Sequence, residues 1–163
     1  MREALAFPHT RDGRAAIIHW MHNRRPLMIS ASDLAIISSC GAKVLLIGKN
    51  EHHGLLSFPG GHAEKNDGNG WQVAVREGSE EIRGITHSTP SYLETLVVDD
   101  PRYRGTDDGI MTTFYRAAHE SGEPAPGDDA DSIHWVARGD LSERLVPWHK
   151  PLGDILLAHW PQD

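Results

Sequence analysis

The sequence contains a single cysteine, Cys40, so no disulfide can form within the chain. Cys40 lies in an apolar run, where a free thiol usually behaves as a small buried hydrophobic group. No stretch approaches the roughly 18 apolar residues of a membrane-spanning helix, and the N-terminal segment lacks the apolar core of a signal peptide. We therefore expect a cytoplasmic protein without a membrane span.

Positive charge is also scarce. The chain has 16 Lys and Arg against 23 Asp and Glu, which gives a net charge of −7. Because domains that bind DNA or RNA are more often basic, we expect no nucleic-acid polymer as a partner. An acidic protein can still bind anionic phosphates when metal ions mediate. The histidines are scattered, and the pair His52-His53 lacks the ligand spacing of a transition-metal site.

The length of 163 residues predicts one domain, in which residues 1–27 form an N-terminal extension. Apolar content of 39% and charged content of 24% are typical of a globular protein. Short-period patterns predict strands at 15–22, 28–39, 42–48, 55–58, 91–100, 109–119 and from 132. A polar loop is expected at 120–131, and three-to-four spacing predicts helices at 70–82, from Leu141, and at 149–160. This order indicates a mixed α/β arrangement with helices covering a sheet.

Three carboxylates follow a glycine turn in the helix expected at 70–82. Glu77, Glu80 and Glu81 fall on one side, since residues three and four apart on a helix are neighbours. One explanation is a solvated acidic face interspersed with arginines. The other is a site for a hard divalent cation, because Mg²⁺ takes oxygen ligands and commonly binds through carboxylates and substrate phosphates. The preceding Gly60-Gly61 would let the backbone approach a ligand closely.

Together, the turn and the helix resemble the Nudix box, the signature of the Nudix hydrolases. In "GHAEKNDGNGWQVAVREGSEEIRGI", Gly61 matches the first glycine, and the pairs Arg76-Glu77 and Glu80-Glu81 match at the right mutual spacing. Glu64 stands where many members have an additional glutamate. The family resemblance extends from about Met28 onward.

The box also departs from the family pattern. Asp67 stands where a second glutamate is expected, and one extra residue near Trp71 precedes Arg76. Gly78 replaces an apolar residue, and Gly84, which we expect to cap the helix, comes one position late. None of these changes alters the spacing between the proposed metal ligands on the helix.

The resemblance implies a Nudix-fold α/β/α sandwich with a mixed β-sheet, and a pyrophosphohydrolase that depends on Mg²⁺ or Mn²⁺. It implies that the metal is held by carboxylates and a backbone carbonyl, namely Glu77, Glu80, Glu81, Gly61 and Glu64. The catalytic residues implied are Glu77, Glu80 and Arg76, with Arg76 orienting a glutamate through a salt bridge. Relatives often form homodimers, and residues 1–25 could contribute to such an interface.

The general base implied by the resemblance is either a glutamate of the box or an acidic residue on a later loop. The loop candidates are Asp107, Asp108, Asp128 and Asp129. Each of them has an ordinary alternative role as a solvated loop residue.

The segment "DDPRYRGTDDGIMT" resembles a region of ADP-ribose pyrophosphatases, including those fused to nicotinamide mononucleotide adenylyltransferases. Arg102 and Arg104 could bind phosphates in a bidentate manner, and Tyr103 could stack on a base or ribose. A solvated turn is the alternative for all three residues. Among the tryptophans, Trp71 is our candidate for base stacking, while Trp148 and the others are assigned to packing.

The resulting hypothesis is hydrolysis of a nucleoside diphosphate linked to another moiety, with ADP-ribose giving AMP and ribose 5-phosphate as the first choice. A modified nucleoside triphosphate or a dinucleoside polyphosphate is an alternative substrate. A nucleotide-sensing module without catalytic activity is an alternative function.

Overall fold

The computed structural model describes residue 18 and residues 26–161. The strands are β1 (Met28–Ile37), β2 (Lys43–Gly48), β3 (Leu56–Ser57), β4 (Gly60–His62), β5 (Ile82–His87), β6 (Ser91–Val98), β7 (Gly109–Pro126) and β8 (Ser132–Ala137). The α-helices are α2 (Gly70–Glu81), α3 (Leu141–Arg144) and α4 (Lys150–Ala158). Short 3-10 turns are η1 (Asn50–His52), η2 (Pro101–Tyr103), η3 (Arg138–Asp140) and η4 (Pro147–His149).

In this part of the chain, eight strands form a mixed sheet built around the pair β1 and β7. These two strands run parallel along the whole of β1, from Met28 beside Gly109 to Ile37 beside Ala118. The other strand pairs are antiparallel. On its second edge β1 changes partner, because residues 31–33 pair with β4 whereas residues 36–37 pair with β2. The sheet therefore opens between β4 and β2.

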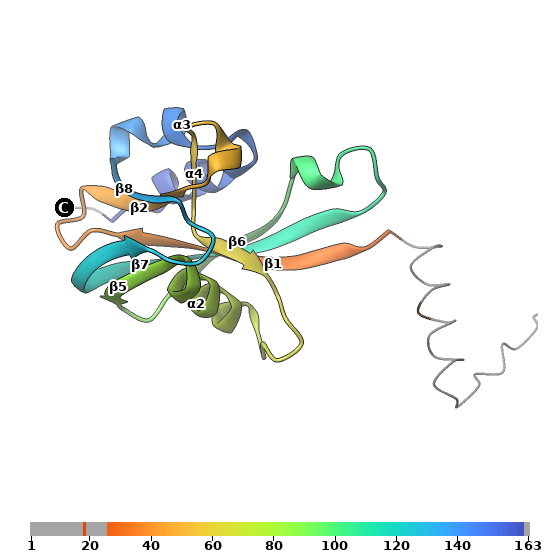
Figure 1. Ribbon diagram of the computed structural model, residues 1–163, viewed down its shortest axis with the longest axis horizontal. Helices are drawn as coiled ribbons and strands as arrows, with labels where there is room; N and C mark the ends of the chain where they lie inside the picture. The colour runs from red at the N-terminus through yellow and green to blue at the C-terminus, as the bar shows by residue number, and fades with distance from the viewer. Residues whose placement is uncertain (1–17, 19–25, 162–163) are drawn as a thin grey trace, which may run out of the picture.

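Helices cover both faces of the sheet, with α2 on one side and α3 and α4 on the other (Figure 1). The alternation of side chains along β1 explains both cores, since successive residues of a strand point to opposite faces. Leu34 and Ile36 pack with Ala74 of α2, whereas Ala35 and Ile37 belong to the core with α3 and α4. The expected α/β sandwich with a mixed sheet is thus confirmed.

The strands expected at 28–39 and 42–48 are confirmed as β1 and β2, which pair antiparallel in a hairpin around Cys40-Gly41. The prediction that Cys40 is buried is wrong, because the thiol lies in the exposed turn of this hairpin. The strand expected at 15–22 lies outside the described residues except for Ile18, whose backbone is helical. Among the described helices, none has the length and apolar character needed to cross a membrane.

The prediction that Gly84 caps the helix is also wrong. The chain is extended from Ile82, where β5 begins directly after α2, and Gly84 lies within that strand at φ +82°. A side chain there would overlap the carbonyl of Glu123 on β7, and the β5–β7 register shifts between Arg83 and Ile85. Gly84 therefore allows an irregularity in the sheet to form.

The polar loop expected from residue 120 is instead the second half of β7, which continues to Pro126 and pairs with β5. Its polar side chains are mostly exposed, so they give no hydrophobic alternation. The pairing of backbone groups with β5 stabilises this segment as a strand.

Candidate active site

A cavity of about 510 Å³ lies beside the opening between β4 and β2. Its volume is within the range of roughly 300–1,000 Å³ that small-molecule sites occupy. Its lining combines acidic, basic and aromatic side chains, among them Asp33, Lys49, His52, Phe58, Glu64, Glu77, Glu81, Asp100, Arg102, Asp129, Trp148 and His149. Residues from the turn, from α2 and from the C-terminal region therefore meet at one site.

Arg76 is the centre of a polar network on α2. Its guanidinium donates to Glu77 at 2.8 Å, to Glu80 at 3.2 Å and to the carbonyl of His62 at 3.0 Å. It also donates to both oxygens of Asp67, at 3.2 and 2.8 Å. These bonds fix the carboxylate of Glu77 and hold the loop 62–69 against the helix.

Asp67 stands where the family has a glutamate, and its place in the structure is defined by Arg76. The carboxylate also accepts a hydrogen bond from the backbone of Glu64 at 2.8 Å. The guanidinium of Arg76, followed by this backbone N–H, lowers the pKa of Asp67. Asp67 does not line the cavity, so its contacts make it an anchor for Arg76.

Glu77 and Glu81 both present carboxylates to the cavity. Glu77 lies against Gly61, where any Cβ would overlap its carboxylate, so only glycine allows this approach. Glu81 pairs with Lys49 at 2.7 Å and accepts from the backbone N–H of Gly60 at 2.8 Å. Burial raises the pKa of both glutamates, although Arg76 and Lys49 act in the opposite direction.

The other two glutamates of the proposed set are placed differently. Glu80 is outside the cavity lining, about half exposed, and bonded to Arg76. Glu64 lines the cavity but its side chain is 68% exposed, with Arg76 at 3.8 Å. The structure therefore brings Glu77, Glu81, Gly61 and Glu64 to the cavity and places Glu80 beside it.

Over residue 18 and residues 26–161, no three His, Cys, Asp or Glu side chains converge closely enough to hold a metal ion by themselves. Magnesium does not require such a cluster, because it commonly binds through one or two carboxylates together with water and substrate phosphates. The donor set of Glu77 and Glu81 is therefore suited to Mg²⁺ or Mn²⁺. A cation there would also offset the cost of burying two carboxylates side by side.

The loop after β6 brings only part of the expected substrate-binding set to the cavity. Arg102 lines it and is held by Asp100, to which its side chain donates at 2.7–3.2 Å. Arg104 pairs instead with Asp99 at 2.8 Å and lies outside the lining. Tyr103 is also outside it, with its hydroxyl 3.4 Å from Nε2 of His62.

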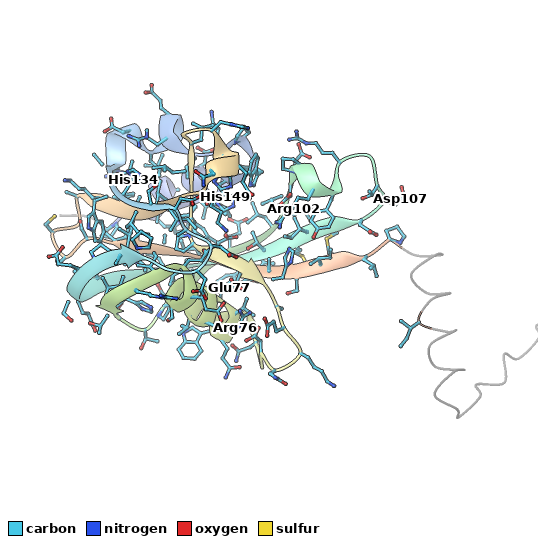
Figure 2. All side chains as sticks on the ribbon, in the orientation of Figure 1. Arg76, Glu77, Arg102, Asp107, His134 and His149 are labelled. Atoms are coloured by element: carbon cyan, nitrogen blue, oxygen red, sulfur yellow. The ribbon has the colours of Figure 1, made fainter. Side chains whose placement is uncertain are left out.

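Of the four loop acids proposed as general bases, one lines the cavity and the other three do not. Asp129 lines the cavity, whereas Asp128 pairs with Arg83. Asp108 accepts from the backbone of Leu27, and Asp107 lies away from Glu77, on the outer loop between β6 and β7 (Figure 2).

The position of Asp129 depends on its neighbours in the loop. The backbone N–H groups of Gly127 and Asp128 donate to the carbonyls of Glu81 and Glu80, at 2.8 and 2.9 Å. The loop thus caps the end of α2 and carries Asp129 to the cavity.

The sequence patterns do not identify several of the residues that line the cavity, notably Asp33, Lys49, Trp148 and His149. Trp148 was assigned to packing, and Trp71, our candidate for stacking, lies outside the cavity. Asp33 had one available signal, since it is a carboxylate within a strand of otherwise small and apolar residues. Its burial at 7% exposure marks it as unusual.

The comparisons with known proteins fit this geometry. The family model described as the NUDIX domain matches residues 29–154, which is most of the chain. The chain belongs to the Nudix family. No curated protein matches it.

Solved structures with the Nudix fold are similar at low sequence identity. One is a bifunctional NMN adenylyltransferase/ADP ribose pyrophosphatase from Francisella tularensis, complexed with AMP and a Mn ion, with a TM-score of 0.65 and 20% identity. The match covers 91% of this chain and 46% of that one, so this chain spans less than half of its length.

Two further structures match over most of both chains. The NUDIX domain of Shewanella oneidensis NrtR, complexed with ADP ribose, has a TM-score of 0.68 and 16% identity, covering 91% of this chain and 98% of that one. An Ap4A hydrolase of C. elegans has a TM-score of 0.64 and 18% identity, covering 81% of this chain and 97% of that one. Nudix membership confirms the expected fold.

Proposed function

We propose that this Nudix protein hydrolyses the pyrophosphate bond of a nucleoside diphosphate linked to another moiety, with Mg²⁺ or Mn²⁺. The main support is a single cavity that joins the glutamates of the box to Lys49 and Arg102. The glutamates would hold the cation, while the two basic side chains are placed to bind phosphate oxygens. The remaining part of the cavity, towards Trp148 and His149, leaves room for the nucleoside.

The protein groups have separate roles in this proposal. Glu77 and Glu81, with the Gly61 carbonyl or Glu64, would hold the cation, which supplies charge neutralisation at the pyrophosphate and promotes attack by water. Arg76 keeps Glu77 oriented through its 2.8 Å bond. Asp129, which lines the cavity from the loop above α2, is our candidate for accepting the proton of the attacking water.

ADP-ribose is our first choice of substrate, with AMP and ribose 5-phosphate as products. The segment 99–112 supports it through Arg102, which lines the cavity. The solved structures that contain AMP or ADP ribose are compatible with it. Dinucleoside polyphosphates and modified nucleoside triphosphates are the alternative substrates, and the similarity to an Ap4A hydrolase keeps the first of them relevant.

The test is turnover of a nucleotide panel with Mg²⁺, with the products identified by chromatography. We expect ADP-ribose to give AMP and ribose 5-phosphate, and chelation of the metal to abolish the reaction. Glu77→Gln should lower kcat by at least a hundredfold, because it removes a charged ligand of the cation. If the wild type binds nucleotides but turns over no member of the panel, the protein is a sensing module instead.

A further inference from the structure

Asp33 and His149 form a pair of polar groups in the cavity that the hydrolytic mechanism does not use. Asp33 comes from β1 and His149 from the turn before α4, and both line the cavity. Oδ1 of Asp33 and Nε2 of His149 are 3.9 Å apart. This distance is too long for a hydrogen bond between them.

The second polar atom of each side chain is already bonded. The hydroxyl of Thr112 donates to Oδ2 of Asp33 at 2.5 Å. The backbone N–H of Phe58 donates to Nδ1 of His149 at 3.2 Å, and the Phe58 ring is stacked on the imidazole at a centroid distance of 6.0 Å. Both side chains are therefore fixed in orientation before any ligand binds.

These bonds determine what each free atom offers. Since Nδ1 of His149 accepts a hydrogen bond, the neutral ring carries its proton on Nε2, and burial keeps it neutral by lowering its pKa to about 4. Burial also raises the pKa of Asp33 to about 7, so above neutral pH its Oδ1 is an acceptor. The cavity thus presents one donor and one acceptor side by side.

We infer that Asp33 and His149 recognise the hydrogen-bonding edge of an adenine base: Oδ1 accepts from the 6-amino group and Nε2–H donates to the adjacent ring nitrogen. This inference rests on the proposed function, whose substrate it specifies further. Adenine offers an N–H donor next to a ring acceptor in one plane, on both its Watson–Crick and its Hoogsteen edge. A buried carboxylate without an N–H or O–H partner at Oδ1 is costly, and the amino group would supply that partner.

The surroundings favour a base over a ribose at this position. Ala31, Val98 and Ile110 line the cavity and pack together as one apolar cluster. Ala31 lies two residues before Asp33 on the same face of β1, and Ile110 lies two residues before Thr112 on the same face of β7. A flat aromatic ring suits such a wall, whereas ribose hydroxyls would lose their hydration against it.

The position is also within reach of the phosphates. Asp33 pairs with Gly60 in the sheet, and the next residue, Gly61, carries the carboxylate of Glu77 against its backbone. Because Asp33 and Glu77 line the same cavity, one nucleotide that follows this cavity would place its base against Asp33 and its phosphate near Glu77.

The test compares the binding of three probes by calorimetry, above the pKa of Asp33. The probes are AMP, purine riboside 5′-monophosphate, which lacks the 6-amino group, and ribose 5-phosphate, which lacks the base. The variant is Asp33→Asn, in which the amide oxygen takes the Thr112 hydroxyl and the amide NH₂ faces the cavity. Asp154→Asn is the matched control, because Asp154 is an exposed acid on α4.

The wild type and the control should bind AMP about tenfold or more tightly than purine riboside monophosphate, as expected for a hydrogen bond to a charged group. In Asp33→Asn this ratio should fall to near one, while the affinity for ribose 5-phosphate stays unchanged. The inference is overturned if the ratio persists in the variant, if the wild type shows no such ratio, or if ribose 5-phosphate loses affinity in parallel with AMP. Failure of ADP-ribose turnover alone, with the ratio behaving as expected, would overturn the hydrolase proposal and leave this inference intact.

Discussion

Replacing Arg76 with lysine is expected to disconnect Glu77 from its support. The guanidinium makes five hydrogen bonds to four groups, at 2.8–3.2 Å. A lysine ammonium has three donors on one atom and cannot bridge Asp67, Glu77 and the His62 carbonyl together. At least two charged bonds are lost, each worth about 1.5–3 kcal/mol. Because the side chain is 23% exposed and water compensates part of this loss, we expect the free energy of unfolding to fall by about 2–4 kcal/mol.

The catalytic effect is expected to be separate from the loss of stability. Removing a residue that orients a metal ligand typically costs about 10–100-fold in metal affinity or activity. Arg76→Lys should therefore need about tenfold more Mg²⁺ for half-maximal rate, or lose kcat to a similar extent at saturating Mg²⁺. Both are measured by Mg²⁺ titration of ADP-ribose turnover, alongside urea unfolding. Arg83→Lys is the control, since Arg83 pairs with Asp128 on the surface.

The reasoning is refuted if Arg76→Lys loses stability but keeps both the Mg²⁺ dependence and kcat of the wild type. In that case Arg76 would only hold the loop 62–69 in place. Asp67→Asn distinguishes the two roles further, because it weakens the support of Arg76 without touching Glu77. It should show the same change in Mg²⁺ dependence with a smaller amplitude.

Three other substitutions test separate parts of the structure. Gly127→Ala should destabilise the protein by roughly 2 kcal/mol or more, the scale of an overpacked site, because a Cβ there would overlap the carbonyl of Glu80. Thermal unfolding measures the loss, and an unchanged Tm would contradict the observed capping of α2. Gly61→Ala should lower kcat strongly while it changes the free energy of unfolding little, since its Cβ would displace the Glu77 carboxylate. An unchanged kcat would contradict the close approach of Glu77 to Gly61. Asp33→Asn should become increasingly more stable than wild type as pH rises from about 4 to 7, because burial raises the pKa of this carboxyl from 3.8 to about 7. Over that range the wild-type carboxyl ionises in the unfolded state but stays protonated in the folded state, so the free energy of unfolding of the wild type falls with pH. The full difference is at most about 4 kcal/mol, and a difference in unfolding free energy that does not change with pH would show that Asp33 ionises normally.

Much of the fold, and the part of the site formed by the glycine turn and α2, could be predicted from local patterns. The β-rich apolar runs of β1 and β2, joined at Cys40-Gly41, predict their hairpin, and the spacing from Arg76 to Glu81 predicts the acidic helix. These features are local in sequence, and the hydrophobic pattern directly reflects the faces of a strand or helix. The ends of elements were less accessible: β7 continues through polar residues because its backbone pairs with β5, which no side-chain pattern reveals.

The part of the site that was missed depends on contacts between distant segments. Asp33 and His149 are brought together by the sheet and by the packing of the C-terminal region, so neither belongs to a local motif. Arg104 and Tyr103 are expected from the sequence to bind substrate, but although they are near Arg102 in sequence they lie outside the cavity lining. A 3-10 turn at 101–103 sends neighbouring side chains in different directions.

The most direct test of the central claim is the rate of ADP-ribose hydrolysis as Mg²⁺ is added to metal-free protein, compared between the wild type and Glu77→Gln. We predict that the wild type produces AMP and ribose 5-phosphate in equal amounts, at a rate that rises from zero to saturation with Mg²⁺. Glu77→Gln should remain at least a hundredfold slower at every Mg²⁺ concentration. A wild-type rate that does not depend on the metal, or a Glu77→Gln protein that hydrolyses ADP-ribose as fast as the wild type, would contradict the account.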